Sequence, residues 1–321
     1  MAKKKTYNYS VIIPHKNIPE LLERCLASIP QRDDVQVIVV DDASDPKIVD
    51  FARFPGMNRP NTEVIFQKNP IGGPGGAGMT RNVGLEVAAG RWLVFADADD
   101  FFHPAVNEMF DRYAEAETDI IFFRHDSVDS NTGEAVGINT SRNRYLDEYD
   151  YTKDETRIRY MIWVPWAKFI RRSLVTGNNI RFDEVRFSNN LMFSVQTGHH
   201  AAGIVSDPAV IYCNTRREGS LIHEGRSDWE AMSQRFDVDW RAAQYIIAAG
   251  RGRLFDRTVA DRWLTLSRLD RKKARKLLPR LREVCSTGQI RRVRFIVAAE
   301  RAVKPVGGPL HRKRRVKQEP S

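Results

Sequence analysis

The sequence places two groups of carboxylates directly after apolar runs. Asp97-Ala98-Asp99-Asp100 follows the run at residues 92–96, and Asp41-Asp42 follows the β-branched run at residues 35–40. A carboxylate pair at the end of an apolar strand suits a hard divalent cation that also holds diphosphate oxygens. Such a cation neutralises the charge that builds on a departing nucleoside diphosphate. The pair at 41–42 suits hydrogen bonds to a nucleobase N–H or a ribose hydroxyl. Each group taken alone is also compatible with an Asp-rich turn.

The elements that must position these carboxylates predict an α/β fold. Apolar runs predict strands, and helical spacing of apolar residues predicts helices between them. The strands are expected at residues 9–13, 35–40, 63–66 and 92–96, and the helices at residues 19–29 and 80–89. Such an alternation predicts a parallel sheet covered by helices on both faces. Because ligands bind beyond the carboxyl ends of parallel strands, we expect the two acidic groups to face one crevice.

The pattern changes after residue 105. A helix is expected near residues 104–116 and a strand at 119–123, followed by a polar stretch, 125–155, of loops with one or two short edge strands. From about residue 228 the sequence becomes helical and basic. Residues 216–321 hold 27 Lys and Arg against 12 Asp and Glu, although the net charge of the whole chain is only +10. The last twelve or so residues are expected to form a frayed tail.

Composition excludes several classes of protein. Hydrophobic residues make up 42% and charged residues 29% of the 321 residues, which is typical of a globular protein and not of a disordered one. No apolar run approaches the roughly 18 residues that span a bilayer, and the run after the basic N-terminus is too short for a signal peptide. Three cysteines without metal-ligand spacing indicate a reducing compartment. We therefore expect a cytoplasmic protein.

Six segments in order resemble the inverting glycosyltransferase family 2. They read Ser10-Val-Ile-Ile-Pro-His-Lys-Asn17, Val37-Ile-Val-Val-Asp-Asp-Ala-Ser-Asp45, Thr80-Arg-Asn-Val-Gly84, Gly90-Arg-Trp-Leu-Val-Phe-Ala-Asp-Ala-Asp-Asp100, Trp166-Ala-Lys-Phe-Ile-Arg-Arg-Ser-Leu174 and Arg217-Glu-Gly-Ser220. The resemblance covers roughly residues 9–222. It implies the GT-A fold, a Rossmann-like, mostly parallel sheet with helices on both faces. It also implies transfer of a sugar, with inversion, from a nucleotide diphosphate donor to a saccharide or lipid-linked saccharide acceptor, with a UDP-sugar favoured and surface polysaccharide assembly as the setting.

The resemblance implies a role for each matching residue. The donor-binding residues would be Pro14, Asn17, Asp41, Asp42, Arg81, Asp97, Lys168, Arg217 and Ser220. Asp97 and Asp99 match the D-x-D element, the first near the ribose and the second a ligand of Mn²⁺ or Mg²⁺. His223, just past the last segment, is a further candidate metal ligand, with a surface histidine as the alternative. Lys168 and Arg217 are equally compatible with solvated basic residues.

One position departs from the family pattern. Members carry an Asp before a short apolar helix, and this Asp deprotonates the acceptor. Here Asn190 occupies that position, and a carboxamide cannot accept a proton in the working pH range. Three interpretations remain open. Asp183 or Glu184 serves as the base, the acceptor needs little help from a base, or the protein is a catalytically weak or inactive relative that binds sugar nucleotides or glycans.

These readings divide the chain into three regions. Residues 1–110 would form the nucleotide-sugar-binding half of the GT-A domain, 111–227 the acceptor-binding half, and 228–321 a basic helical region with a flexible tail. The basic region would suit peripheral contact with an anionic membrane near a lipid-linked acceptor, or would be a helical cap with a solvated basic face. Nucleic acid is not expected as a partner, since the sequence has no helix-turn-helix, zinc-ligand or RNP-like signature.

Overall fold

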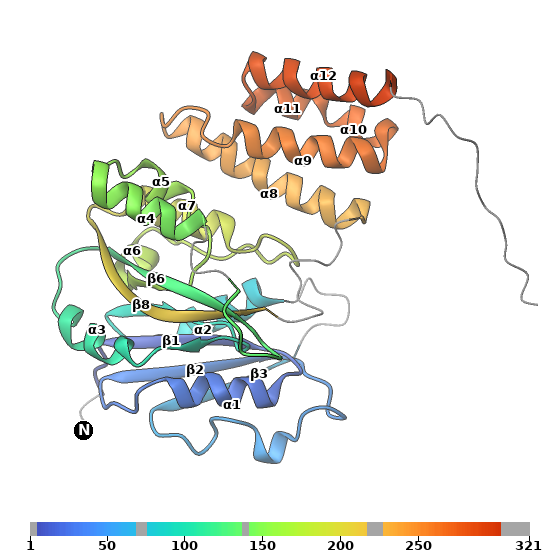
Figure 1. Cartoon of the computed structure of the whole chain (residues 1–321). Helices are drawn as coiled ribbons and strands as arrows, with labels where there is room; N and C mark the ends of the chain where they lie inside the picture. Colours follow the sequence, from blue (N-terminus) through green and yellow to red (C-terminus); the bar gives the residue numbers. More distant parts are fainter. Residues whose placement is uncertain (1–4, 69–75, 137–140, 217–226, 303–321) are drawn as a thin grey trace, which may run out of the picture. The chain divides into compact units, whose positions relative to one another are not determined.

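The computed structural model describes residues 5–68, 76–136, 141–216 and 227–302. Its strands form one mixed sheet (Figure 1). The sheet has eight strands in the order β3-β2-β1-β4-β7-β6-β8-β5. The chain divides into two compact units between Ala242 and Ala243, and the sheet belongs to the first. None of the helices in the described ranges is both long and apolar enough to cross a membrane.

Four parallel strands form the first half of the sheet, close to the predicted ranges. They are β1 (Tyr9–His15), β2 (Val35–Asp42), β3 (Thr62–Gln67) and β4 (Trp92–Phe95). β1 lies between β2 and β4, with His15 opposite Asp41 and Ile12 opposite Phe95. Every residue of β2 is buried, as expected for a strand of a parallel sheet that is covered on both faces.

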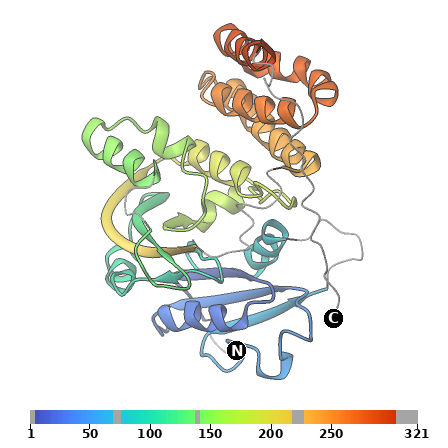
Figure 2. The same ribbon diagram turned by 45° about the vertical axis from the view of Figure 1, so that its right-hand side comes forward.

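Helices cover both faces of these strands. α1 (Pro19–Ser28) and α2 (Ala77–Val87) lie on opposite faces (Figure 2). The chain crosses from β1 to β2 in one direction and from β3 to β4 in the other, and right-handed crossovers then place the two helices on opposite sides. Gly84 lets α2 approach β1 closely, since a Cβ there would lie 2.5 Å from Cγ2 of Ile12. A short 3-10 helix, η1 (Phe51–Arg53), lies between β2 and β3.

The second half of the sheet is mixed. Its strands are β5 (Phe101–Phe102), β6 (Ile120–Asp129), β7 (Lys168–Arg171) and β8 (Ile204–Arg216). β7 runs antiparallel to β4 and β6, β8 runs parallel to β6, and β5 pairs antiparallel with β8. The helices of this half are α3 (Ala105–Tyr113), α4 (Ser141–Thr152), α5 (Thr156–Tyr160), α6 (Arg172–Gly177) and α7 (Leu191–His200).

The prediction of loops across residues 125–155 was wrong. β6 continues to Asp129, and residues 141–152 form α4. Only three apolar or aromatic side chains of this helix, Tyr145, Leu146 and Tyr149, face the core, at helical spacing. The stripe is too narrow to outweigh the polar residues around it, so the sequence does not show the helix before tertiary packing is known.

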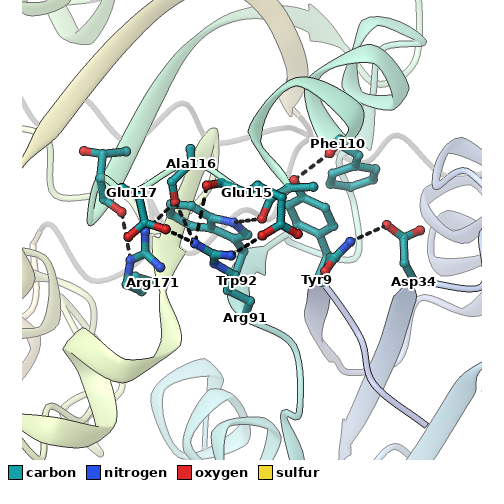
Figure 3. Close-up of polar contacts among 12 residues, drawn as sticks. Tyr9, Asp34, Arg91, Trp92, Phe110, Glu115, Ala116, Glu117 and Arg171 are labelled. Carbon is teal, nitrogen blue, oxygen red and sulfur yellow. Dashed lines mark hydrogen bonds and ion pairs between the residues drawn. The ribbon is translucent and has the colours of Figure 1, made fainter.

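The amino ends of β1 and β4 contact α3 and the segment that follows it (Figure 3). Arg91, just before β4, forms ion pairs with Glu115 at 2.7 Å and Glu117 at 2.8 Å. The buried Tyr9 hydroxyl donates to the carbonyl oxygen of Phe110 at 2.7 Å. These contacts lie at the edge of the sheet opposite the carboxyl ends of the strands. They therefore brace the sheet and leave the other edge for chemistry.

The predicted helical C-terminal region is confirmed. It comprises α8 (Trp229–Ala248), α9 (Asp256–Leu269), α10 (Arg271–Lys276), α11 (Leu278–Val284) and α12 (Thr287–Ala302). In the second unit α9 is the central helix, with Val259, Trp263 and Leu266 buried against its neighbours. The indole of Trp263 donates to the carbonyl oxygen of Ala274 at 2.9 Å. The boundary between the units falls inside α8.

Candidate active site

The two acidic strand ends lie at the same edge of the sheet and are joined by the first turns of α2. The backbone N–H of Gly76, which precedes α2, donates to Oδ2 of Asp42 at 3.0 Å. Five residues later, Arg81 reaches Asp97 at 2.5 Å. One helix therefore contacts the carboxylate after β2 and the carboxylate after β4. These contacts place Asp42 and Asp97 at the same edge of the sheet, as the sequence predicted.

Asp41 and Asp42 have different surroundings, as neighbours in a strand must. Asp41 is 1% exposed and accepts hydrogen bonds from Nδ1 of His15 at 2.8 Å and from the hydroxyl and N–H of Ser44. Burial alone would raise the pKa of Asp41, but these hydrogen bonds outweigh it and hold the pKa below its ordinary value. Nε2 of His15 accepts from the N–H of Ile18, which places the ring proton on Nδ1. Asp41 thus holds the loop after β1.

Asp42 faces the site more directly. Its Oδ2 lies 3.0 Å from the N–H of Gly76 and 3.5 Å from Nζ of Lys16. Asn17 adopts a left-handed backbone, with φ of 57°, and its Oδ1 accepts from the N–H of Asp45 at 2.7 Å. This contact ties the loops after β1 and β2 together. Pro14 lies within β1, opposite Val40.

Arg81 links the donor half of the domain to the segment at residues 183–190. Its side chain is buried and contacts Asp97 through Nη2 and Oδ1 of Asn189 through Nη1, at 3.1 Å. The guanidinium also lies over the ring of Phe182, 5.3 Å from its centroid. A planar, permanently charged fork suits these three simultaneous contacts, and a lysine would not replace it.

The turn after β4 is built around a buried carboxylate that sequence reasoning did not single out. Asp100 is 0% exposed and accepts from the hydroxyl of Tyr212 at 2.8 Å, Nδ2 of Asn214 at 3.1 Å and the N–H of Thr215 at 2.8 Å. The same Tyr212 hydroxyl accepts from the N–H of Asp97 at 2.9 Å. β8 therefore sets the shape of the D-x-D turn. Burial raises the pKa of Asp100 well above its ordinary value, and the nearby Asp97 and Asp99 add to the rise.

Only the position of Asp100 beside the D-x-D element pointed to this residue in the sequence. Tyr212 lies 112 positions away, inside an apolar run that predicts nothing more than a strand. Its ring stacks on Trp166, with centroids 5.0 Å apart and planes 13° apart. Trp166 is the first residue of one of the six family-like segments, so the sequence indicated that it lies near the site. No feature of the sequence indicated this for Tyr212.

The side chains of Asp97 and Asp99 fit a hard divalent cation. The side chain of Asp97 is 32% exposed, and Asp99 is also partly exposed, so both residues are accessible to solvent. Burial raises the pKa of Asp97; the Arg81 guanidinium opposes the rise and the Asp99 carboxylate adds to it. Mg²⁺ and Mn²⁺ prefer carboxylate oxygens as ligands, and a bound cation would also relieve the repulsion between these two carboxylates. The backbone of the turn is held by Thr215, whose hydroxyl donates to the carbonyl oxygen of Asp99 at 2.5 Å.

A second group of potential ligands lies nearby but on another face. In the described ranges, one ligand atom each from His103, Asp126 and Cys213 lie within 4.8 Å of one another. Cys213 sits between Tyr212 and Asn214 in β8, and side chains alternate along a strand, so it points away from Asp100. A thiol with an imidazole and one carboxylate suits a softer metal than Mg²⁺ or Mn²⁺. This group is therefore separate from the D-x-D turn.

The candidate bases lie on the segment that precedes α7. Asn190 is the residue before the first turn of this helix, and its side chain makes no cap to the helix. Both oxygens of Asp183 accept from Arg241, at 3.0 and 2.9 Å. Glu184 is exposed and accepts from Nδ2 of Asn82 at 3.3 Å. Gly78 of α2 touches this segment so closely that a Cβ would lie 2.1 Å from the carbonyl oxygen of Asp183.

The remaining predicted residues have other placements. Lys168 is buried in β7, where Nζ donates to the carbonyl oxygen of Ile162 at 2.8 Å and lies 5.0 Å from the ring centroid of Phe122. Burial lowers the pKa of Lys168 to about 7. The structure joins it to no residue of the D-x-D turn within the described ranges. Arg217, Ser220 and His223 lie outside the described residues.

Comparisons with known proteins give one family. The model of glycosyl transferase family 2 matches residues 10–176, just over half of the chain. The chain is 30% identical over 184 residues to the uncharacterized glycosyltransferase YibD of Escherichia coli K12, covering 55% of this chain and about half (52%) of YibD.

Two solved structures share the fold. Residues 1–349 of TarS from S. aureus, in complex with UDP-GlcNAc, superpose with a TM-score of 0.61 at 22% identity, over 82% of this chain and 71% of that chain. The mannosyltransferase PcManGT from Pyrobaculum calidifontis, in complex with GDP-Man and Mn²⁺, superposes with a TM-score of 0.53 at 17% identity, over 94% and 81%. The predicted GT-A fold is thus confirmed, and the chain belongs to glycosyl transferase family 2.

Proposed function

We propose that this glycosyltransferase moves a sugar from a nucleotide diphosphate donor, with a UDP-sugar favoured, onto a saccharide or lipid-linked saccharide acceptor, with inversion and in surface polysaccharide assembly. The observation that carries the proposal is the contact of one helix, α2, with both acidic strand ends. Gly76 contacts Asp42, and Arg81 contacts Asp97. The nucleotide-sugar complexes of TarS and PcManGT, with the same fold, support a donor of this class.

In this proposal Asp42, the carboxylate at the end of β2, accepts hydrogen bonds from the nucleobase or ribose. Asp97 and Asp99 would hold Mn²⁺ or Mg²⁺, whose chemistry is to neutralise the diphosphate as it leaves. Arg81 keeps Asp97 in place from the protein side. The buried Asp100, held by Tyr212, keeps the turn in one conformation, so that little reorganisation is needed when the donor binds.

Activation of the acceptor is the open step. A general base contributes roughly 10²–10⁴-fold, and Asn190 cannot act as one. Both oxygens of Asp183 are engaged by Arg241, which makes Asp183 the poorer candidate. Glu184 is exposed, and its Oε2 has no hydrogen-bond partner in the part of the chain that the structure describes. We therefore assign the base to Glu184, and the alternative is a weak or inactive relative that binds sugar nucleotides or glycans.

A thermal-shift panel of UDP-, GDP- and dTDP-sugars with and without Mn²⁺ tests the donor. Stabilisation by one nucleotide class that requires Mn²⁺ and is lost in Asp99→Asn supports the proposal. Asp111→Asn, an exposed carboxylate of α3, is the matched control and should keep the full shift. If no nucleotide diphosphate stabilises the protein, the donor assignment fails.

The base is tested by hydrolysis and transfer assays on two variants. Glu184→Gln should lower turnover by roughly 10²-fold or more without changing donor binding. Asn190→Asp restores a carboxylate at the start of α7 and should raise turnover. Donor binding without hydrolysis or transfer, combined with no gain in Asn190→Asp, would favour the non-catalytic alternative.

A further inference from the structure

Three side chains that can bind a metal, His103, Asp126 and Cys213, come together outside the donor residues described above. One ligand atom of each lies within 4.8 Å of the other two, and Nε2 of His103 is 2.9 Å from Oδ1 of Asp126. His103 and Asp126 are 23 positions apart in the sequence, and Cys213 is far from both, so only the folded chain brings the three together. None of them takes part in the donor site proposed above.

The register of the sheet holds the three side chains on one face. Cys213 of β8 lies opposite Phe101 of β5 on one side and opposite Asp126 of β6 on the other. Residues directly opposite each other point to the same face, and so do residues two positions apart in an extended chain, which brings His103 to the face of Phe101. The N–H of His103 donates to the carbonyl oxygen of Ile211 at 2.9 Å and continues the pairing of β5 with β8. Paired strands therefore fix the backbone of all three residues before a metal binds.

The distances within the group fit a tetrahedral metal ion. Bonds of about 2.0–2.3 Å from zinc to nitrogen, oxygen and sulfur place neighbouring ligand atoms roughly 3.3–3.6 Å apart. The 2.9 Å between His103 and Asp126 and the 4.8 Å limit for the whole group lie on either side of this spacing. The side chains of His103 and Asp126 are each 29% exposed, which leaves room for them to rotate and a path for the ion and a water ligand. Side-chain rotation can therefore complete the site without movement of the strands.

The ligand types select the class of ion. A thiolate and an imidazole favour zinc and similar ions over Mg²⁺, which prefers oxygen ligands. Burial and the hydrogen bond to Asp126 raise the pKa of Cys213 to about 12, so the metal-free protein carries a thiol there. Binding must displace this proton, and a coordinated thiol is deprotonated outright. The thiolate and the carboxylate then balance the two charges of the cation, as a partly buried ion requires.

We propose that His103, Asp126 and Cys213 form a binding site for Zn²⁺ or a similar thiophilic divalent ion, on the face of β8 opposite Tyr212. This site is separate from the cation site proposed in the D-x-D turn and does not depend on the donor assignment. A bound ion would join β5, β6 and β8 just beyond that turn, because His103 follows Asp100 by three residues. It would thereby stabilise the folded state of this half of the sheet.

Titration of the full chain with Co²⁺, after treatment with a chelator, tests the site, because a cobalt–thiolate bond gives a charge-transfer band in the near ultraviolet. The band should saturate at about one Co²⁺ per chain and should be bleached by Zn²⁺, which binds such ligands more tightly, and not by Mg²⁺. Cys213→Ser should abolish the band. His103→Ala and Asp126→Asn, at partly exposed positions, should each weaken Co²⁺ binding by at least about tenfold, since even outer-shell partners of metal ligands contribute roughly 10–100-fold.

Two variants serve as controls. Cys285→Ser removes another buried thiol, in the second unit, and Asp99→Asn alters the D-x-D turn; both should keep the band and the affinity for Co²⁺. Absence of the band in the native protein, an unchanged band in Cys213→Ser, or its loss in either control overturns the proposal. If Cys213→Ser does not fold, the other two variants decide, and native affinity for Co²⁺ in both His103→Ala and Asp126→Asn overturns it. The three residues would then form a structural hydrogen-bonded group only.

Discussion

The hydroxyl of Tyr212 forms hydrogen bonds to two residues of the D-x-D turn, Asp97 and Asp100. Its removal tests whether these bonds hold the turn in position. Tyr212→Phe deletes one oxygen that accepts from the N–H of Asp97 at 2.9 Å and donates to Asp100 at 2.8 Å. The ring, which stacks on Trp166, is retained. The variant therefore removes one buried and one partly buried hydrogen bond and leaves the packing in place.

The magnitude follows from the groups left without partners. The N–H of Asp97 is left without this hydrogen-bond partner at a cost of about 1–3 kcal/mol, and the carboxyl group of Asp100 loses one of its donors at a comparable or smaller cost. We expect the free energy of unfolding to fall by about 2–4 kcal/mol. The pKa of Asp100 should rise further, because the Tyr212 hydrogen bond lowers it in the native protein. Since Asp97 and Asp99 belong to this turn, affinity for UDP with Mn²⁺ should fall as well.

Urea unfolding measures the first effect, and titration with UDP in the presence of Mn²⁺ measures the second. Tyr113→Phe is the matched control, because its hydroxyl also donates to a carboxylate, Asp207, at 2.7 Å, but at a half-buried position away from the turn. The control should lose about 1 kcal/mol and keep its affinity for UDP. If Tyr212→Phe loses no more stability than Tyr113→Phe and binds UDP with Mn²⁺ as well as the native protein, the hydroxyl does not position the turn.

Two further substitutions probe the contacts around the site. In Gly78→Ala the new Cβ would lie 2.1 Å from the carbonyl oxygen of Asp183, so the segment at residues 183–190 must move; urea unfolding should show a loss of about 1–3 kcal/mol, and transfer should slow. The second concerns His125, whose pKa burial lowers from an ordinary 6.5 to about 4. Because the unfolded chain binds this proton more tightly, native stability should be lost as the pH falls from 6.5 to 4, by up to about 3 kcal/mol, and His125→Phe should lose less over that range in urea unfolding at each pH.

Each of these has its own control. Gly177→Ala places a Cβ where no atom lies within 4 Å, so it should leave stability and transfer unchanged; an equal effect of the two glycine variants would contradict the close contact between α2 and residue 183. For His125, the comparison is the difference between native and variant stability at pH 7 and at pH 4. A difference that stays constant over this range would show that His125 does not carry the pH dependence.

The sequence alone determined the parallel half of the fold and the identity of its acidic groups. The runs that became β1, β2 and β4 are mostly apolar and buried, and burial on both faces of a parallel sheet demands that pattern locally. The carboxyl ends of such strands must share an edge, so Asp42 and Asp97 could be assigned to one site before any coordinate was known. The apolar runs and the carboxylates that follow them can both be recognised from residues only a few positions apart in the sequence.

Tertiary structure alone decided how that site is supported. Tyr212 with Asp100, Arg81 with Asn189 and Arg241 with Asp183 join residues 112, 108 and 58 positions apart. Local periodicity carries no information about such pairs, since each side chain is unremarkable in its own segment. α4 escaped prediction for a related reason, because its narrow apolar stripe gains its free energy only from the core against which it packs.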